Sequence, residues 1–146
     1  MRIAIGCDHR GYDLKESLKG YLAGNGHEVK DFGTHSKDSV DYPVFAKEVA
    51  MAIATGEYNR GILICGSGIG MQIAADKIKK IRAANCRDED DAYRSRAHND
   101  ANVLTLGADK ITGDLAKRIV DKWLTTDFEA GRHQRRVDMI EEMENG

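Results

Sequence analysis

Short apolar runs alternate with longer amphipathic segments along almost the whole chain. A short run bounded by polar or glycine-rich sequence is typical of a strand, whereas apolar residues three or four positions apart in a longer segment favour a helix. The chain therefore predicts five strands, at 2–7, 28–33, 61–65, 82–86 and 102–107. Helices are expected at 14–26, 44–56, 88–97, 111–126 and about 133–144, and another begins at Met71.

Strands that alternate with helices indicate a mostly parallel sheet covered on both faces, with right-handed crossovers. We expect a single α/β domain over 1–146, a doubly wound three-layer sandwich with a five-stranded sheet. In such folds ligands bind beyond the carboxyl ends of the strands, where the strand order reverses. The candidate residues therefore follow the first three strands: Asp8 and His9, the segment 33–42 and the segment 65–70.

Composition and charge exclude several classes of protein. The chain has 146 residues, 41% of them hydrophobic, and a formal net charge of -2, which argues against a nucleic-acid partner. No segment approaches the roughly 18 apolar residues of a membrane span, so we expect a cytoplasmic protein without a membrane partner. The three cysteines form no C-x-x-C pair, so neither a disulfide framework nor a zinc site is indicated. We interpret Cys7 and Cys86, which have no glycine loop beside them, as structural.

The stretch GILICGSGIG at 61–70 places a cysteine between a predicted strand and a glycine-rich loop. It is not a P-loop, a good dinucleotide fingerprint or a nucleophile elbow, because the required spacings are absent. Backbone N–H groups around Gly66, Gly68 and Gly70 would attract negative charge before a helix, which predicts an oxyanion-binding loop. Cys65 is then either a reactive thiolate, serving as nucleophile or base, or a small buried residue at a strand end.

Two polar clusters stand at element boundaries. Asp8-His9 follows the first predicted strand and could bind sugar hydroxyls, a phosphate or a metal, although no metal-ligand spacing accompanies it. His98-Asn99-Asp100 precedes the fifth predicted strand. An isolated histidine of this kind is more often a surface or capping residue than a catalyst.

The last predicted helix opens with the basic segment GRHQRR at 131–136 and ends with the acidic segment EEME at 141–144. This order opposes the helix dipole, which favours acids at the start and bases at the end by roughly 0.3–1 kcal/mol each. The arginines are either held for an anion, since guanidinium groups match phosphate oxygens, or form a solvated or intersubunit face. Both interpretations are open on the residues alone.

Five separated motifs, GCDHRGYDLK, DFGTHSKDSVDYP, GILICGSGIGMQIAADK, RAHNDANVL and GRHQRRV, resemble those of the type B ribose-5-phosphate isomerases. The family also holds galactose-6-phosphate and allose-6-phosphate isomerases. The resemblance covers almost the whole chain and implies a Rossmann-like α/β/α fold that works without a metal or other cofactor. It also implies a homodimer or a dimer of dimers with active sites shared between subunits, and we expect the last helix to pack on the partner.

The resemblance further implies interconversion of aldose and ketose phosphates through a cis-enediolate, with Cys65 as the base that moves the proton between the first two sugar carbons. Ser67 would assist proton transfer at the oxygens, and the backbone of the glycine loop would stabilise the enediolate. His98 would open the furanose ring, reaching in from the neighbouring subunit. The implied substrate-binding residues are Asp8, His9, Tyr42, Gly66, Gly68, Gly70, Asn99, Arg132 and Arg136.

Several positions depart from the family's pattern. Many members have threonine where this chain has Ser67, which keeps the hydroxyl. In another branch a glutamate acts as base at the position of Met71, which cannot take a proton, so Cys65 has to carry the role here. Some relatives have an arginine that aids phosphate binding where this chain has Asp109; an acid there would repel phosphate, and Lys110 could replace the contact. Asp76 stands where relatives commonly have asparagine.

The expected reaction is the interconversion of D-ribose 5-phosphate and D-ribulose 5-phosphate. Allose 6-phosphate or galactose 6-phosphate is the alternative substrate. The loop at 34–42 should decide whether the site accepts a pentose or a hexose phosphate. A non-catalytic module that binds a phosphate ligand would need the glycine loop and the arginines but neither Cys65 nor His98. The proton-transfer groups stand together with the anion-binding ones, which favours the enzyme.

Overall fold

Five strands form one sheet in the computed structural model, which describes residues 1–146. The strands are β1 (Arg2–Cys7), β2 (Glu28–Asp31), β3 (Arg60–Cys65), β4 (Ala83–Asn85) and β5 (Val103–Gly107). Their order in the sheet is β2-β1-β3-β5-β4, and every neighbouring pair is parallel. The predicted α/β class and five-stranded sheet are confirmed, and the sheet is wholly rather than mostly parallel.

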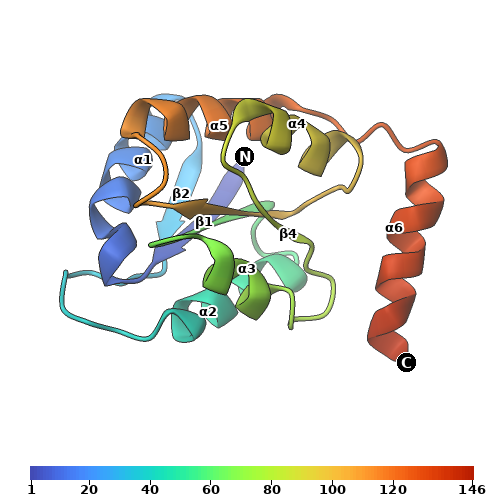
Figure 1. The fold of residues 1–146 in the computed structure, drawn as a ribbon, viewed down its shortest axis with the longest axis horizontal. Coiled ribbons are helices and arrows are strands. Elements are labelled where there is room, and N and C mark those ends of the chain that lie inside the picture. Colours follow the sequence, from blue (N-terminus) through green and yellow to red (C-terminus); the bar gives the residue numbers. More distant parts are fainter.

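Helices cover both faces of this sheet (Figure 1). One layer holds α1 (Tyr12–Gly24), α4 (Glu89–Ala97) and α5 (Gly113–Thr125), and the other holds α2 (Tyr42–Ala54) and α3 (Ile69–Ala75). Two short 3-10 helices, η1 (His9–Gly11) and η2 (Met143–Asn145), precede α1 and end the chain. Between α5 and η2 lies α6 (Arg132–Glu142). No helix is long and apolar enough to cross a membrane.

Alternation along the strands divides the core into two parts. Ile62 and Ile64 pack with Trp123 in the layer of α1, α4 and α5, whereas Leu63 and Cys65 pack in the layer of α2 and α3. Successive strand residues point to opposite faces, so this division follows directly from their positions. The side chain of Cys65 is thereby directed toward the start of α3.

The reversal of strand order lies between β1 and β3, because β2 lies on one side of this pair and β4 and β5 lie on the other. The backbone N–H of Asp8 donates to the carbonyl of Ile64 at 3.1 Å and ties the two strand ends together. Gly11 lies so close to β3 that a Cβ there would come within 2.8 Å of the Ile64 carbonyl carbon, which only glycine allows. This packing holds the residues after β1 beside the residues after β3, as the ligand-site rule for such folds requires.

The final helix α6 stands away from the rest of the chain (Figure 1). Its polar contacts with the body of the chain include an ion pair between Glu141 and Arg82 at 2.7 Å and, beyond its end, a hydrogen bond from the Lys80 N–H to Glu144 at 2.8 Å. A groove of about 690 Å³ separates α6 from the body of the chain. Val137 of α6 is buried, whereas the apolar side chains of Met139 and Ile140 in α6 and of Met143 in η2 are exposed.

A fully buried lysine fastens the turn after β2. Lys15 Nζ donates to both carboxylate oxygens of Asp31 at 2.8 Å and to the carbonyl of Thr34 at 2.6 Å. Asp31 also accepts from Lys19 at 2.7 Å. Because the carbonyl of Thr34 lies at the start of the connection to α2, this cluster sets the course of the chain toward Tyr42.

Stability in acid is expected to depend on Asp31. Burial alone would raise the pKa of this carboxyl, but hydrogen bonds from Lys15 and Lys19 bring it below its ordinary value. A carboxyl whose pKa is lower in the folded chain stabilises the fold above its unfolded pKa of about 3.9 and loses that contribution as the pH falls through the folded value. Urea unfolding at about pH 6 and about pH 3 should therefore show a fall in stability that is smaller for Asp31→Asn. An equal fall in both proteins would contradict this role.

Candidate active site

A cleft of about 650 Å³ opens at the carboxyl edge of the sheet, where β1, β3 and β5 end. Six of the residues predicted from the sequence line it: Asp8, Tyr42, Cys65, Gly66, Ser67 and Gly70. The remaining lining residues are Arg10, Ile69, Ile73, Asp109 and Lys110. The structure therefore brings these residues, which follow the strand ends, together at one cleft.

Cys65 is the last residue of β3, and its side chain is 5% exposed at the floor of the cleft. Its sulfur accepts a hydrogen bond from the backbone N–H of Gly68 at 3.2 Å. An N–H aimed at sulfur stabilises negative charge there, as backbone donors do for other anions. The thiol is thus accessible from the cleft and has a donor placed to support a thiolate.

The other two thiols lie outside the cleft and are held protonated. Burial raises the pKa of Cys7 to about 11 and that of Cys86 to about 12. Both side chains belong to the core on the opposite face of the sheet. Since the thiolate is the reactive form, these values support the interpretation of both residues as structural.

The glycine loop is shaped by close contacts. Gly68 has a φ of +80° and is the residue before α3, and a Cβ there would meet the side-chain amide oxygen of Asn85. Gly70 already belongs to α3, and a Cβ on it would come within 2.6 Å of the Tyr42 ring. The glycines therefore allow Asn85 and Tyr42 to pack directly against the loop.

Two backbone N–H groups of the loop donate hydrogen bonds to side chains of the same loop. The N–H of Gly68 points to Cys65, and the N–H of Ile69 donates to Ser67 Oγ at 3.2 Å. The sequence predicted an anion cradle made of these backbone donors. In the structure these two act on the cysteine and serine, and α3 is only 7 residues long, so its dipole is small.

Asp8 and His9 organise the turn after β1. The carboxylate of Asp8 accepts from the N–H groups of Arg10 at 3.0 Å and Gly11 at 3.1 Å and so caps η1. His9 Nδ1 accepts from the N–H of Val40 at 3.2 Å, which fastens the connection before α2. His9 stands next to the cleft but does not line it.

Sequence reasoning missed an ion pair across the cleft. Arg10 Nη2 and Asp109 Oδ2 are 2.6 Å apart, and both side chains crowd Gly66, where a Cβ would be 3.0 Å from each. The acid at Asp109 therefore meets a cation rather than facing the cleft alone, and Lys110 adds a second positive group to the lining. Arg10 follows β1 and Asp109 follows β5, so the strand-end rule could have marked both residues as candidates. Their pairing, however, depends on the order of β1, β3 and β5 in the sheet.

The other departures from the family's pattern have structural roles. Met71 is fully buried in the core on the face of α2 and α3. Asp76 accepts a hydrogen bond from the N–H of Ala83 at 2.7 Å, at the start of β4. Burial raises the pKa of Asp76, and this hydrogen bond opposes the shift. Neither residue lines the cleft.

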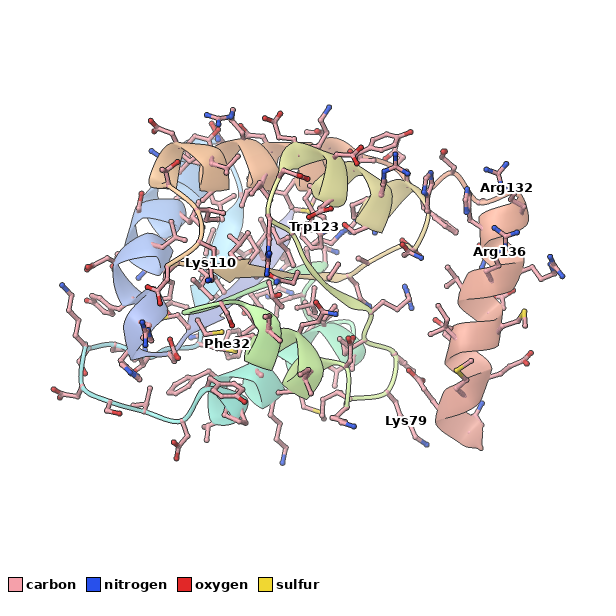
Figure 2. The ribbon with its side chains drawn as sticks, viewed as in Figure 1. Phe32, Lys79, Lys110, Trp123, Arg132 and Arg136 are labelled. Carbon is pink, nitrogen blue, oxygen red and sulfur yellow. The ribbon has the colours of Figure 1, made fainter.

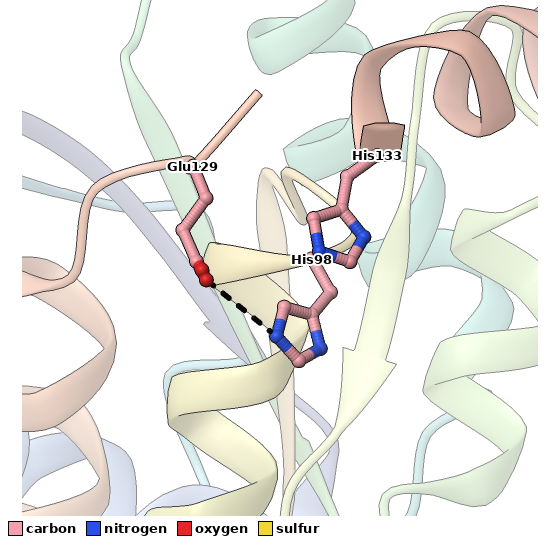
Figure 3. Close-up of side chains that lie close together, drawn as sticks. All are labelled: His98, Glu129 and His133. Atoms are coloured by element: carbon pink, nitrogen blue, oxygen red, sulfur yellow. Dashed lines mark ion pairs between the residues drawn. The ribbon is translucent and has the colours of Figure 1, made fainter. Parts of the chain in front are cut away.

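His98 and the arginines of α6 form a second cluster. His98 caps the C-terminal end of α4, and its ring stacks on His133 with centroids 4.4 Å apart, while Glu129 lies 3.7 Å from His98 Nε2 (Figure 3). Burial lowers the pKa of His133, and His98 and Arg132 lower it further. Arg132 and Arg136 are exposed on the same helix as His133. Asn99 lines the groove beside α6 rather than the cleft.

The segment after α4 is fastened by Asp100, which has a φ of +49°. Its carboxylate pairs with Arg96 at 2.8 Å and with Arg82 at 3.3 Å. Arg96 is almost fully buried and also donates to the carbonyl of Ala101 at 2.7 Å. These contacts hold the backbone of His98 and Asn99 in one conformation.

The two clusters lie on opposite sides of a single chain. The cleft is at the carboxyl ends of the strands, whereas His98 and Asn99 stand between α4 and the amino end of β5. Figure 2 shows the same separation between Lys110, which lines the cleft, and Arg132 and Arg136 on α6. The structure therefore does not bring His98, Asn99, Arg132 or Arg136 to Cys65 within one chain.

Comparisons with known proteins agree over nearly the full length. The model of the Ribose/Galactose Isomerase family matches residues 3–140. Ribose-5-phosphate isomerase B of Escherichia coli K12 is 49% identical over 143 residues, or 98% of this chain and 96% of that protein. The solved structure of ribose-5-phosphate isomerase B from Clostridium thermocellum has a TM-score of 0.98 at 52% identity and covers 99% of this chain and 98% of that one. That from Thermotoga maritima has a TM-score of 0.95 at 50% identity, with 97% of each chain covered.

Proposed function

The chain belongs to the Ribose/Galactose Isomerase family, and we infer that it is an aldose-ketose isomerase that interconverts D-ribose 5-phosphate and D-ribulose 5-phosphate. The single observation that carries the chemistry is the thiol of Cys65 at the floor of the cleft, with the N–H of Gly68 at its sulfur. A thiolate there is a base that needs no metal. Hexose phosphates are the less favoured substrates.

The proton moves through Cys65. Its thiolate takes the proton from C2 of the open-chain aldose, which leaves a cis-enediolate, and the resulting thiol returns the proton to C1 of the ketose. Ser67 Oγ accepts from the N–H of Ile69, so its own hydroxyl proton is free to move to and from the substrate oxygens. Asp8 and Tyr42 line the same cleft and would bind the sugar hydroxyls.

The complete site is proposed to need two chains. His98 is the residue proposed to open the furanose ring, yet it lies on the side of its own chain away from Cys65. A second copy that brings its His98 and Asn99 to the cleft completes the set, and a closed homodimer forms two equal sites in this way. Apolar side chains are exposed both on α6 and at the cleft, where they are Ile69 and Ile73. Contact between these two surfaces in a dimer would bury them, which supports such a partner.

The phosphate would be bound by cations from both chains. Arg132 and Arg136 carry guanidinium groups suited to phosphate oxygens and would come from the partner with α6. Arg10 lines the cleft and His9 lies next to it, and both would act from the chain that supplies Cys65.

All three cysteines are free, which fits a reducing compartment such as the cytoplasm.

Arg10→Ala is expected to raise KM for ribose 5-phosphate about tenfold and to change kcat much less, because it removes a charge-assisted contact made in binding. Steady-state kinetics measures both constants. Arg94→Ala is the matched control, since Arg94 is an exposed arginine paired with Asp90 on α4 outside the cleft. A KM unchanged in Arg10→Ala, or raised equally in the control, would exclude Arg10 from binding.

The test of the proposed function is the conversion of ribose 5-phosphate to ribulose 5-phosphate by the purified protein in excess EDTA. We expect full activity, since no step requires a metal ion. Conversion of allose 6-phosphate in preference to ribose 5-phosphate would establish the hexose alternative. Folded protein that binds phosphate sugars without converting any of them would instead establish a binding module.

A further inference from the structure

Three metal-ligating side chains meet beside α6, and two of them have no part in the proposed reaction. His98 caps the C-terminal end of α4, Glu129 lies in the connection from α5 to α6, and His133 lies in the first turn of α6 (Figure 3). Their ligand atoms all lie within 4.8 Å of one another. We propose that His98, Glu129 and His133 form a binding site for Zn²⁺, and that Zn²⁺ bound there inhibits the isomerase.

The donor set suits this ion. Two imidazole nitrogens and a carboxylate oxygen are ligands that Zn²⁺ takes in proteins, with bonds of about 2.0–2.2 Å and a fourth position for water. Tetrahedral bonds of that length place the donor atoms about 3.4 Å apart. The separation of Glu129 Oε1 from His98 Nε2 is already 3.7 Å, so this pair needs little movement.

The second histidine has to turn. The rings of His98 and His133 are nearly parallel, with an interplanar angle of 12°, and a metal in the plane of both rings requires one of them to rotate. His133 is only half-buried and makes no side-chain hydrogen bond, so its ring is free to rotate. The carboxylate of Glu129 is 44% exposed and can follow it.

The backbone under the three ligands is fixed, which lowers the cost of assembling them. The N–H of Glu129 donates to the carbonyl of Ala97 at 3.0 Å and joins the connection to the end of α4. The N–H of His133 donates to the carbonyl of Ala130 at 2.9 Å and starts α6 beside it. The ligand segments are therefore held together before any ion arrives.

Occupation of this site would remove His98 from catalysis. A zinc-bound imidazole nitrogen has no lone pair or proton to exchange with the sugar ring. The inhibitory consequence rests on the proposed function, whereas the binding of Zn²⁺ does not. The same protein would thus be active in EDTA and inhibited by added Zn²⁺.

Calorimetric titration of Zn²⁺ into metal-free protein tests the binding. The wild type is expected to bind a single ion per chain, and His133→Ala and Glu129→Gln should each weaken it at least about tenfold. His35→Ala, which removes an exposed histidine elsewhere, should bind as the wild type does. Cys65→Ala should also bind normally, because a thiolate in the cleft is the rival zinc ligand.

Activity assays test the inhibition. We expect Zn²⁺ to inhibit the wild type, EDTA to restore it, and His133→Ala to require at least about tenfold more Zn²⁺. Unchanged zinc affinity in His133→Ala, or affinity lost in Cys65→Ala, would overturn the site. If the wild type binds Zn²⁺ through His133 but isomerises no ribose 5-phosphate, the zinc site stands and the proposed function is wrong.

Discussion

Cys65→Ala is expected to lower kcat for ribose 5-phosphate isomerisation by roughly 10²-fold or more, with a much smaller change in KM. A general base contributes about 10²–10⁴-fold. The two carboxylates that line the cleft already have partners, since Asp8 caps η1 and Asp109 pairs with Arg10. Met71, the position of the base in another branch of the family, is buried in the core. The interaction lost is made in the transition state, so kcat and kcat/KM should fall together.

The matched control for this experiment is Cys86→Ala. It also removes a buried thiol, but one in the opposite core and outside the cleft, so kcat should stay near the wild-type value. Circular dichroism and thermal unfolding verify that both variants are folded. Isomerisation that continues at the wild-type rate in folded Cys65→Ala would mean that another residue is the base.

Lys15→Met is expected to lower the free energy of unfolding by about 3 kcal/mol, because it breaks a buried ion pair and leaves Lys19 as the only cation on the mostly buried Asp31 carboxylate. Lys15 is fully buried and bonds to both oxygens of Asp31 and to the carbonyl of Thr34. Methionine fills a similar volume but restores none of these hydrogen bonds. Urea unfolding monitored by circular dichroism measures the change.

Lys19→Met separates burial from charge in this experiment. Lys19 pairs with the same carboxylate at 2.7 Å, but its side chain is 33% exposed. Exposed ion pairs contribute about 0–1 kcal/mol, so this variant should lose much less stability. Equal losses of unfolding free energy in the two variants would show that the burial of Lys15 does not increase its contribution to stability.

The order of elements could be predicted because nearly every one has a clear local signal. Short apolar runs mark the five strands, and Pro43 lies in the first turn of α2, as proline at a helix start does. The boundaries were less accurate: α2 begins at Tyr42 rather than at Val44, and β2 ends at Asp31, before Gly33 with its φ of +99°. The turn η1 was not predicted, because it depends on the carboxylate of Asp8 capping it.

The candidate site could be predicted in part for a similar reason. Asp8 and Cys65 each follow a strand, and the rule for parallel sheets places such residues together. Arg10 and Asp109 are far apart in the chain. Their pairing could have been predicted only with the knowledge that β3 lies between β1 and β5. The position of His98 away from the cleft of its own chain was implied by the family resemblance and not by the pattern of residues, because it depends on where α4 ends relative to the sheet.

Complementation between Cys65→Ala and His98→Ala tests whether each active site is built from two chains. Each variant alone should be nearly inactive, since each lacks one proton-transfer group in every site. If the site joins Cys65 of one chain to His98 of the other, a heterodimer purified with a different tag on each chain contains one intact site and one doubly defective site. We therefore expect about half of the wild-type activity per heterodimer. A heterodimer no more active than its parents would contradict it.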